Sequence, residues 1–357
     1  MALHEKYMLR CIDLASMGLR AAMPNPGVGA VIVHNETIIG EGYTSPYGGA
    51  HAEVNAINAV LEKEFLKEST LYVSLEPCSH YGKTPPCTEL IIKSGIPKVV
   101  IGIRDPFKAV NGSGIEKLQK SGIEVTEGVL EKKCYEVNKR FFTFHKKNRP
   151  YIILKWARSA DGFMDKKRED SEKGIHWITQ PETQILTHQW RADEMAIAIG
   201  TNTAIIDNPS LTVRAVNGKN PWRIVLDKDL SLDIKLNIFN KDSNTLILNQ
   251  IESKINAHLE YVKIDFSNVI PELLKVLKEK NILSVIIEGG NKFLHSFIEA
   301  NIWDEARIIT GDVEFKEGLP APIIYTTPVT SYLCGKDKVA VYQNDNPSDL
   351  LTPINIK

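Results

Sequence analysis

The sequence predicts an α/β protein with two domains, and three observations lead to this prediction. The chain has 357 residues, which is more than one ordinary domain requires. Short apolar runs alternate with amphipathic stretches along its whole length. A brief charged run at 146–150 ends in a proline, which cannot join a helix interior. We therefore expect one domain over 1–147 and a second over 150–357.

The first domain is expected to start with a helix over 4–22. Charged residues interrupt the apolar positions of this segment, whereas a signal peptide needs an unbroken apolar centre. Apolar runs on either side of a polar triplet at 34–36 predict paired strands over 30–33 and 38–42. The rest of the domain is predicted to alternate between strands, over 70–75 and 98–103, and helices, over 51–63, 87–93 and 130–144.

The second domain is predicted to be another α/β series. Its apolar runs predict strands over 151–155, 196–199, 223–226, 245–248 and 284–287. Amphipathic stretches between them predict helices over 181–191, 271–280 and 291–299. Hydrophobic residues make up 43% of the chain, which is enough apolar material for a core in each domain.

Composition and charge exclude several classes of protein. The net charge is −1, from 43 basic and 44 acidic residues, so no nucleic-acid surface is indicated. No apolar run has the length that a membrane-spanning helix needs. The 5 cysteines are an odd and sparse set, which favours metal ligation or free thiols over disulfides. We therefore expect a cytoplasmic protein with neither nucleic acid nor a membrane as its partner.

The first domain holds a candidate zinc site. His51 precedes Glu53 by two residues, and Cys78 and Cys87 follow downstream, each with a proline directly before it. One histidine and two cysteines supply three ligands to Zn²⁺ and leave the fourth position to water, as a catalytic zinc requires. The ligands lie where helices are expected to begin, and helix N-termini favour thiolate over thiol.

Glu53 has the properties of a proton carrier beside that metal. Zinc deaminases combine a His/Cys/Cys site with a glutamate that is not a ligand. Zinc makes hydroxide available at neutral pH for attack on an amidine-like ring carbon, and the glutamate carries the proton to the departing ammonia. The alternatives are a structural zinc site, for which His80 is the nearest fourth ligand, or two buried cysteines without a metal.

The spacing of the cysteines resembles one known family. The segment at 77–87, Pro-Cys-Ser-His-Tyr-Gly-Lys-Thr-Pro-Pro-Cys, closely resembles the bifunctional deaminase–reductases of riboflavin biosynthesis. The turn Pro-Asn-Pro-Gly-Val-Gly at 24–29 resembles the pyrimidine-binding turn of the same family. Reductase-like motifs follow in the expected order, with Leu-Lys-Trp-Ala at 154–157, Trp-Ile-Thr at 177–179, Arg-Ala at 191–192, Asp-Asn-Pro-Ser-Leu-Thr-Val-Arg at 207–214 and Glu-Gly-Gly at 288–290.

This resemblance implies a fold and two consecutive activities. The first domain would be a cytidine-deaminase-like three-layer α/β/α domain, and the second a dihydrofolate-reductase-like α/β domain. The first would use zinc to remove the 2-amino group of 2,5-diamino-6-ribosylamino-4(3H)-pyrimidinone 5′-phosphate. The second would use NADPH to reduce the ribosyl side chain to ribityl. The family also implies a homo-oligomer.

The resemblance assigns roles to residues at matching positions. Zinc would be held by His51, Cys78 and Cys87, with Glu53 as the catalytic proton carrier. The substrate-binding positions would be Asn25, Lys83, Arg191, Ser210, Leu211, Arg214 and Glu288. The cofactor-binding positions would be Ala157, Trp177, Thr203, Asp207, Gly290, Asn291, Lys292, Phe293, Leu294, His295 and Ser296. Arginine suits a phosphate, because its planar fork binds two oxygens at once.

Three positions depart from the family pattern. Thr44 stands where the family usually has a histidine, seven residues before the zinc histidine. Phe107 stands where an asparagine is usual, in the turn that follows Asp105. Ile175 stands where a serine is usual, two residues before the Trp-Ile-Thr motif, which removes a hydroxyl contact to the substrate.

Two other functions remain as alternatives at this point. One is a nucleoside or tRNA zinc deaminase with an unrelated or degenerate C-terminal domain. The other is a zinc-stabilised binding protein without catalysis. Ammonia release from cytidine or adenosine would favour the first, and zinc binding without any turnover would favour the second.

Overall fold

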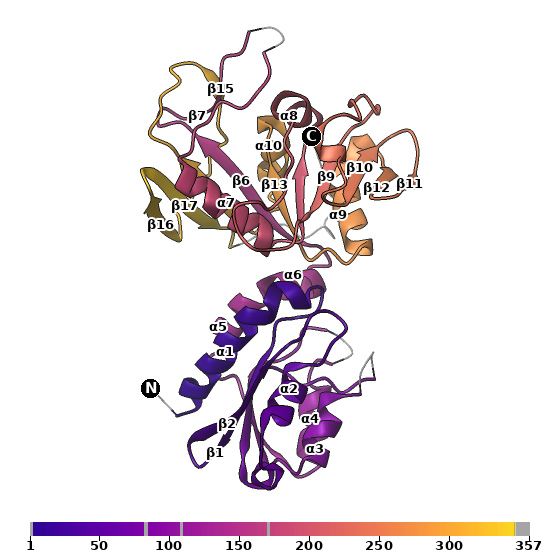
Figure 1. Ribbon diagram of the computed structural model, residues 1–357, viewed down its shortest axis with the longest axis vertical. Coiled ribbons are helices and arrows are strands. Elements are labelled where there is room, and N and C mark those ends of the chain that lie inside the picture. The colour runs from indigo at the N-terminus through magenta and orange to yellow at the C-terminus, as the bar shows by residue number, and fades with distance from the viewer. Residues whose placement is uncertain (1–2, 82–84, 108–109, 170–171, 346, 348–357) are drawn as a thin grey trace. The chain divides into compact units, whose positions relative to one another are not determined.

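The computed structural model describes residues 3–81, 85–107, 110–169, 172–345 and 347. The chain divides into two compact units, Met1–Lys147 and Asn148–Lys357, which are described separately (Figure 1). No helix among the described residues is long and apolar enough to cross a membrane.

The first unit has a five-stranded sheet between two layers of helices. The strand order is β2 (Thr37–Tyr43), β1 (Gly29–His34), β3 (Thr70–Leu75), β4 (Lys98–Ile103) and β5 (Glu124–Glu127). Strand β1 is antiparallel to β2 and β3, whereas β3, β4 and β5 are parallel. Helices cover both faces of the sheet, so its central strands β1, β3 and β4 are buried on both sides and read as near-continuous apolar runs.

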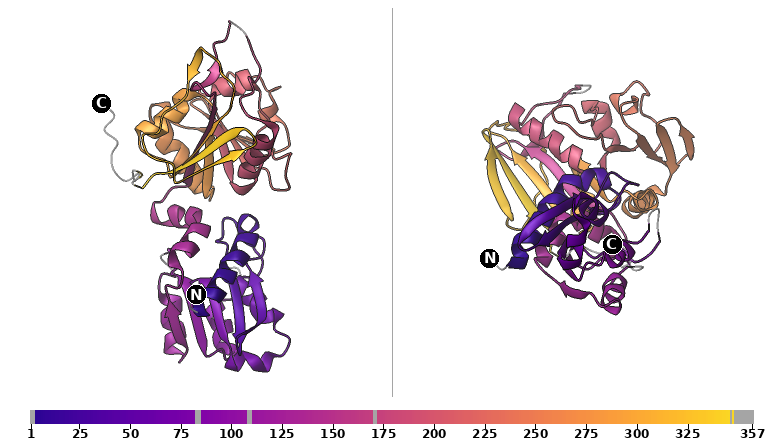
Figure 2. Two further views of the ribbon diagram at one scale, coloured as in Figure 1. Left: turned by 90° about the vertical axis from the view of Figure 1, so that its left-hand side faces the viewer. Right: turned by 60° about the horizontal axis from the view of Figure 1, so that its bottom comes forward.

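Helices cover both faces of this sheet (Figures 1 and 2). On one face lie α1 (Leu3–Ala22) and α5 (Glu131–Val137), followed by α6 (Lys139–Lys146). On the other lie α2 (Ala52–Ala59), α3 (Cys87–Lys93) and α4 (Ser113–Lys120), and a 3₁₀ segment spans Lys63–Glu68. This is the three-layer arrangement expected for the first domain.

Two helix predictions in this unit were wrong. The helix expected over 51–63 ends at Ala59, because the chain turns extended at Val60. The helix expected over 130–144 is two helices, α5 and α6, separated by Asn138. Asparagine interrupts helices because its side chain competes for backbone hydrogen bonds. Helix α4 and strand β5 were not predicted.

The second unit is built on a ten-stranded sheet. Its strand order is β11 (Lys254–Asn256), β12 (Leu259–Lys263), β10 (Thr245–Asn249), β9 (Trp222–Leu226), β8 (Ala196–Ile199), β13 (Ser284–Glu288), β6 (Tyr151–Arg158), β14 (Glu305–Thr310), β17 (Asp337–Gln343) and β16 (Thr330–Cys334). The strands from β12 to β14 are parallel, and the remaining three are antiparallel additions at the two edges. A separate pair joins β7 (Phe163–Lys166) and β15 (Gly318–Pro320).

Strand β6 shows how both faces of this sheet are buried. Ile152, Leu154 and Trp156 pack in a core with α9 (Val269–Glu279) and α10 (Asn291–Glu299). The alternate residues Tyr151 and Ile153 pack in a second core with α7 (Pro181–Asp193) and α8 (Thr201–Asp207). Short 3₁₀ segments span Asn237–Phe239 and Phe266–Asn268.

The charged run at 146–150 is not simply an exposed linker. Arg149 is fully buried and makes a bidentate ion pair with Asp304, with nitrogen–oxygen distances of 2.5 and 2.9 Å. Asp304 also accepts a hydrogen bond from the Ile152 amide at 2.9 Å. A buried pair of this kind fixes the start of β6 beside the start of β14.

Candidate functional sites

The three predicted zinc ligands converge in the first unit. His51 Nδ1 lies 3.6 Å from Cys78 Sγ and 3.3 Å from Cys87 Sγ. The ligand atoms of all three residues lie within 4.8 Å of one another. One imidazole nitrogen and two thiolate sulfurs form a donor set suited to zinc, with a fourth position left for water. These residues therefore fit a catalytic zinc ion.

The local backbone explains why these side chains meet. His51 is the residue before α2, and Cys87 is the first residue of α3, so both side chains lie at helix N-termini. Cys78 follows β3, and its sulfur accepts a hydrogen bond from the Cys87 amide at 3.3 Å. Hydrogen bonding from the Cys87 side chain, and then from His51, lowers the pKa of Cys78 despite burial, and the same pairing raises the pKa of Cys87. A thiolate is the form that binds a metal.

Glu53 lies in the first turn of α2 and is 3% exposed. Burial, followed by the nearby Cys78 sulfur, raises the pKa of Glu53 to about 7. Its carboxylate also interacts with the Cys87 side chain. A carboxyl group with a pKa near the working pH is suited to both accepting and releasing a proton.

His80 does not join this cluster. Its ring instead approaches that of Phe107, with 6.0 Å between the centroids. Among the described residues, the metal-binding group comprises only His51, Cys78 and Cys87. The closed four-ligand site that a structural zinc would need is therefore absent from the described part of the chain.

Glu76 is a site residue that the sequence did not reveal. Its carboxylate is 3% exposed and accepts hydrogen bonds from four backbone amides, at 3.0 to 3.3 Å, those of Asp105, Gly112, Gly114 and Ile115. Ser79 Oγ lies 2.6 Å from Ser113 Oγ, which adds a second link between the same segments. The segment that carries Cys78 is thereby joined to the loop before α4.

Replacing Glu76 by glutamine should lower the affinity of the site for zinc. The amide nitrogen of glutamine would face backbone donors, and losing a residue that supports a metal ligand typically costs about tenfold or more in affinity. We expect zinc to pass to a competing chelator about tenfold faster than from the unmodified protein. Glu116→Gln, on the exposed face of α4, is the control because its carboxylate pairs with the exposed Lys120 at 3.3 Å. Equal release rates in both variants would contradict this role of Glu76.

The remaining predicted residues of the first unit are only partly described. Asn25 is partly exposed in the turn between α1 and β1, and its amide donates to Ala22 O at 3.0 Å. Lys83 lies outside the described residues. Thr44, one of the departures from the family pattern, is buried, and its Oγ1 accepts a hydrogen bond from the Val28 amide at 2.9 Å.

In the second unit, Glu288 is held between two cations. Lys155 Nζ donates to one carboxylate oxygen at 2.5 Å, and Arg191 lies 3.6 Å from the other. Burial would raise the pKa of Glu288, but Lys155 and Arg191 outweigh it and lower that pKa to about 2. Lys155 comes from β6, directly opposite Glu288 at the end of β13. The sequence did not single out Lys155 as a site residue.

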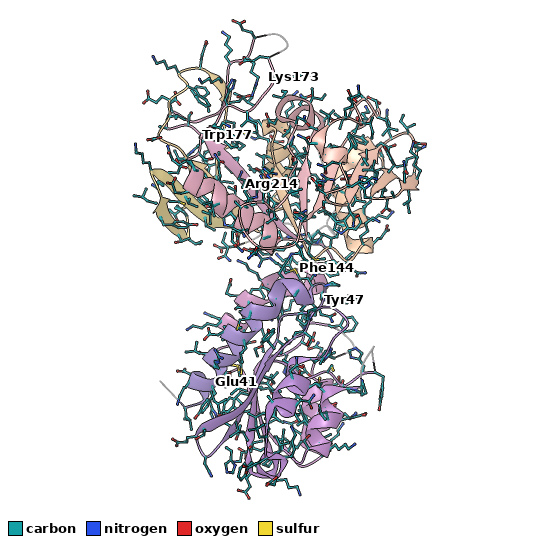
Figure 3. The ribbon with its side chains drawn as sticks, viewed as in Figure 1. Glu41, Tyr47, Phe144, Lys173, Trp177 and Arg214 are labelled. Carbon is teal, nitrogen blue, oxygen red and sulfur yellow. The ribbon has the colours of Figure 1, made fainter. Side chains whose placement is uncertain are left out.

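His188 lies near the two arginines predicted to bind the substrate, Arg191 and Arg214. Its Nδ1 accepts a hydrogen bond from the Arg214 amide at 3.1 Å. Burial, followed by the positive charges of Arg191 and Arg214, lowers the pKa of His188. The structure therefore brings Arg191, Arg214 and Glu288 near His188 on α7, and Arg214 is labelled in Figure 3.

The predicted cofactor turn is formed by the residues between β13 and α10. Gly289 has a φ of +87°, and a side chain on it would lie 2.6 Å from Thr203 Oγ1. Thr203, on α8, accepts a hydrogen bond from the Gly290 amide at 3.0 Å. Close packing against α8 thus requires glycine at 289, and it joins two predicted cofactor positions, Thr203 and Gly290.

Other predicted positions of the second unit differ in exposure. Trp177, in the loop before α7, is 59% exposed (Figure 3). Asp207 lies at the end of α8, where burial raises the pKa of its carboxyl group to about 6. Ala157 and Ser210 are partly exposed, as are four of the α10 residues, Asn291, Phe293, His295 and Ser296; Lys292 is exposed. The side chains of Leu211 and Leu294 pack in the cores instead, so they present almost no surface to a ligand. Ile175 is exposed.

Comparison with known proteins identifies both units. The model of the cytidine and deoxycytidylate deaminase zinc-binding region matches residues 1–103, and that of the RibD C-terminal domain matches residues 150–312. The structure of a diaminohydroxyphosphoribosylaminopyrimidine deaminase/5-amino-6-(5-phosphoribosylamino)uracil reductase from Thermotoga maritima gives a TM-score of 0.85 at 36% identity, covering 96% of this chain and 98% of that chain. The fold classes predicted for the two domains are confirmed.

Relatives of known name match along most of the chain. Riboflavin biosynthesis protein RibD of Aquifex aeolicus (strain VF5) is 39% identical over 323 residues, which is 88% of this chain and 88% of that protein. Riboflavin biosynthesis protein RibD of Bacillus amyloliquefaciens is 40% identical over 313 residues, 85% of this chain and 83% of that protein. The resemblance inferred from the sequence motifs is therefore confirmed, and the chain belongs to the riboflavin biosynthesis protein RibD family.

Proposed function

We propose that this chain is a bifunctional enzyme of riboflavin biosynthesis, a zinc-dependent deaminase and an NADPH-dependent reductase. Its substrate is 2,5-diamino-6-ribosylamino-4(3H)-pyrimidinone 5′-phosphate, whose 2-amino group is removed before the ribosyl side chain is reduced to ribityl. The observation that carries the proposal is the convergence of His51, Cys78 and Cys87 beside the buried Glu53. That cluster lies in a chain whose second part matches the RibD C-terminal domain.

In the deaminase unit, His51, Cys78 and Cys87 hold the zinc ion. Zinc supplies a water that is activated at neutral pH. Glu53 accepts the proton of that water and delivers it to the departing amino group, a role that its burial in the first turn of α2 supports. Asn25 and Lys83 bind the phosphorylated pyrimidine.

In the reductase unit, the charged groups around His188 bind the substrate. Arg191 and Arg214 bind its phosphate and ribose, with Ser210 and the backbone at Leu211, while Glu288 accepts hydrogen bonds from its hydroxyls. NADPH supplies the hydride. Its binding positions are the turn and helix Gly290–Ser296, Thr203, Asp207, Ala157 and Trp177. The N-terminus of α10 has no side-chain cap, so its backbone amides suit an anionic group of the cofactor.

The other functions considered from the sequence are less well supported. A nucleoside or tRNA deaminase with an unrelated C-terminal domain is not favoured, because RibD relatives match along most of the chain. A non-catalytic zinc protein gives no reason to bury a carboxylate beside the metal ligands. We further propose a cytoplasmic homo-oligomer that acts on small molecules and has neither nucleic acid nor a membrane as a partner.

The proposal is tested by supplying the diaminopyrimidinone substrate and NADPH to the purified protein and following ammonia and NADPH together. We expect one equivalent of ammonia to be released and one equivalent of NADPH to be oxidised per turnover. Ammonia release without NADPH oxidation would refute the reductase assignment. Release of ammonia from cytidine or adenosine, but not from the riboflavin precursor, would refute the substrate.

Removing zinc should separate the two activities. A chelator is expected to abolish ammonia release, because three ligands without the ion cannot activate water. NADPH oxidation with the deaminated intermediate should continue at its original rate, since none of the proposed zinc ligands lies in the second unit. Added zinc should restore ammonia release. Loss of both activities on chelation would contradict this division of labour.

A further inference from the structure

Side chains from three distant segments accept hydrogen bonds from three consecutive amides where the turn after α1 leads into β1. The Gly27 amide donates to Asn138 Oδ1 at 2.9 Å, the Val28 amide to Thr44 Oγ1 at 2.9 Å, and the Gly29 amide to Ser74 Oγ at 3.1 Å. The three residues that donate these amides, Gly27, Val28 and Gly29, are all buried. Because a buried amide without a partner is costly, these side chains determine the backbone path of the turn.

Asn138 has the most extensive role of the three. Its side-chain nitrogen also donates to the Gly27 carbonyl at 2.8 Å, so its carboxamide satisfies both backbone groups of one residue. Asn138 is 1% exposed and is 111 residues from Gly27 in sequence. A side chain on Gly27 would lie 2.8 Å from the Ala15 carbonyl of α1. The turn therefore packs closely against α1 and is hydrogen-bonded to Asn138.

The same residue interrupts what would otherwise be one continuous helix. Asn138 ends α5 and precedes α6, with φ −107° and ψ 17°. Its own backbone remains satisfied, because its amide donates to Tyr135 O at 2.9 Å and its carbonyl accepts from the Phe142 amide at 2.9 Å. The break therefore costs little hydrogen bonding, and it places a buried carboxamide opposite the turn.

We propose that Asn138 is a positioning residue for the deaminase substrate, acting through the turn at 24–29 that carries Asn25. This inference rests on the proposed function, in which Asn25 contacts the pyrimidine. The side-chain hydrogen bonds of Asn138 go to Gly27 and not to His51, Cys78 or Cys87. Its loss should therefore affect substrate binding rather than the metal or the proton carrier. Thr44 supports the adjacent residue, Val28, in the same way.

The test compares Asn138→Ala and Asn138→Leu with the unmodified enzyme. Both variants remove the two hydrogen bonds, but leucine largely preserves the side-chain volume. We expect each variant to raise the KM for the pyrimidine substrate about tenfold or more, with kcat within about twofold. Zinc content and NADPH oxidation with the deaminated intermediate should be unchanged.

Asn249→Ala is the matched control. Asn249 is also fully buried and bonds to backbone groups, including the Ile251 and Glu252 amides at 2.8 Å, but it lies in the second unit. The Asn249→Ala variant should therefore have the same KM for the deaminase reaction as the unmodified enzyme. A normal KM in Asn138→Leu, or an equal rise in the Asn249 control, would overturn the positioning role.

Amide hydrogen exchange tests the inference without relying on turnover or on a variant that folds. In the unmodified protein, the Gly27 amide should exchange as slowly as amides in the sheet. Exchange of Gly27 at the rate of exposed loop amides would overturn the inference. If the unmodified protein released no ammonia but protected Gly27, the proposed function would fail while the anchoring of the turn remained.

Discussion

Replacing Glu53 by glutamine is expected to slow ammonia release by about 10²- to 10⁴-fold, the usual contribution of a positioned general acid–base group. Glutamine preserves the size of the side chain but cannot accept the proton of the attacking water or deliver it to the leaving amino group. Zinc should stay bound, because Glu53 is not one of the three residues whose ligand atoms converge. The measurements are initial rates of ammonia release and the zinc content of the purified variant.

Two controls make this result specific. Glu41→Gln removes a carboxylate from β2 (Figure 3), where Glu41 pairs with Arg10 at 2.7 Å and both side chains are partly exposed. That variant should keep the native rate, because an exposed ion pair contributes little. In Glu53→Gln, reduction of the supplied deaminated intermediate should also be native. Ammonia release at the native rate in Glu53→Gln would show that another group carries the proton.

The metal site could be predicted from the sequence because each of its determinants is local. His51 and Cys87 lie at the starts of helices that the apolar pattern also predicts, and Glu53 is two residues from its metal ligand. Local patterns also located β1, β3 and β4 of the first sheet and β6, β8, β9, β10 and β13 of the second, since apolar runs with short turns are the signal for such strands. They did not locate the buried strand β14. Most of the errors were at element ends, or in segments whose structure depends on distant partners.

The supporting residues could not be predicted, because their function depends on contacts far apart in sequence. Asn138 resembles an ordinary helical position until Gly27 is placed beside it, 111 residues away. Glu76 depends on a loop that begins at Asp105, 29 residues later. Lys155 meets Glu288 only through the pairing of β6 and β13, which brings together residues 133 apart. Composition and periodicity carry no information about such pairs.

Glu288→Gln should have the largest effect on the reductase unit. The carboxylate is held by Lys155 at 2.5 Å and by Arg191 at 3.6 Å, and glutamine would remove the negative charge that faces these two half-buried cations. We expect reduction of the deaminated intermediate to slow by about 10²-fold or more, because Arg191, which we propose binds the substrate, would no longer be fixed. Ammonia release should be unaffected, since Glu288 belongs to the second unit.

The same pair predicts how the stability of this unit depends on pH. The pKa of Glu288 falls from 4.5 to about 2 on folding, so its charge stabilises the folded unit above pH 4.5, by about 3 kcal/mol, and this contribution is lost as the pH falls towards 2. Thermal unfolding of the unmodified protein and of Glu288→Gln should therefore differ most at neutral pH and converge in acid. The transition of the reductase unit is recognised by its shift to higher temperature with NADPH. Because glutamine does not titrate, a constant difference between the two proteins from neutral pH to about pH 2 would mean that the Glu288 carboxylate carries no charge-dependent share of this stability.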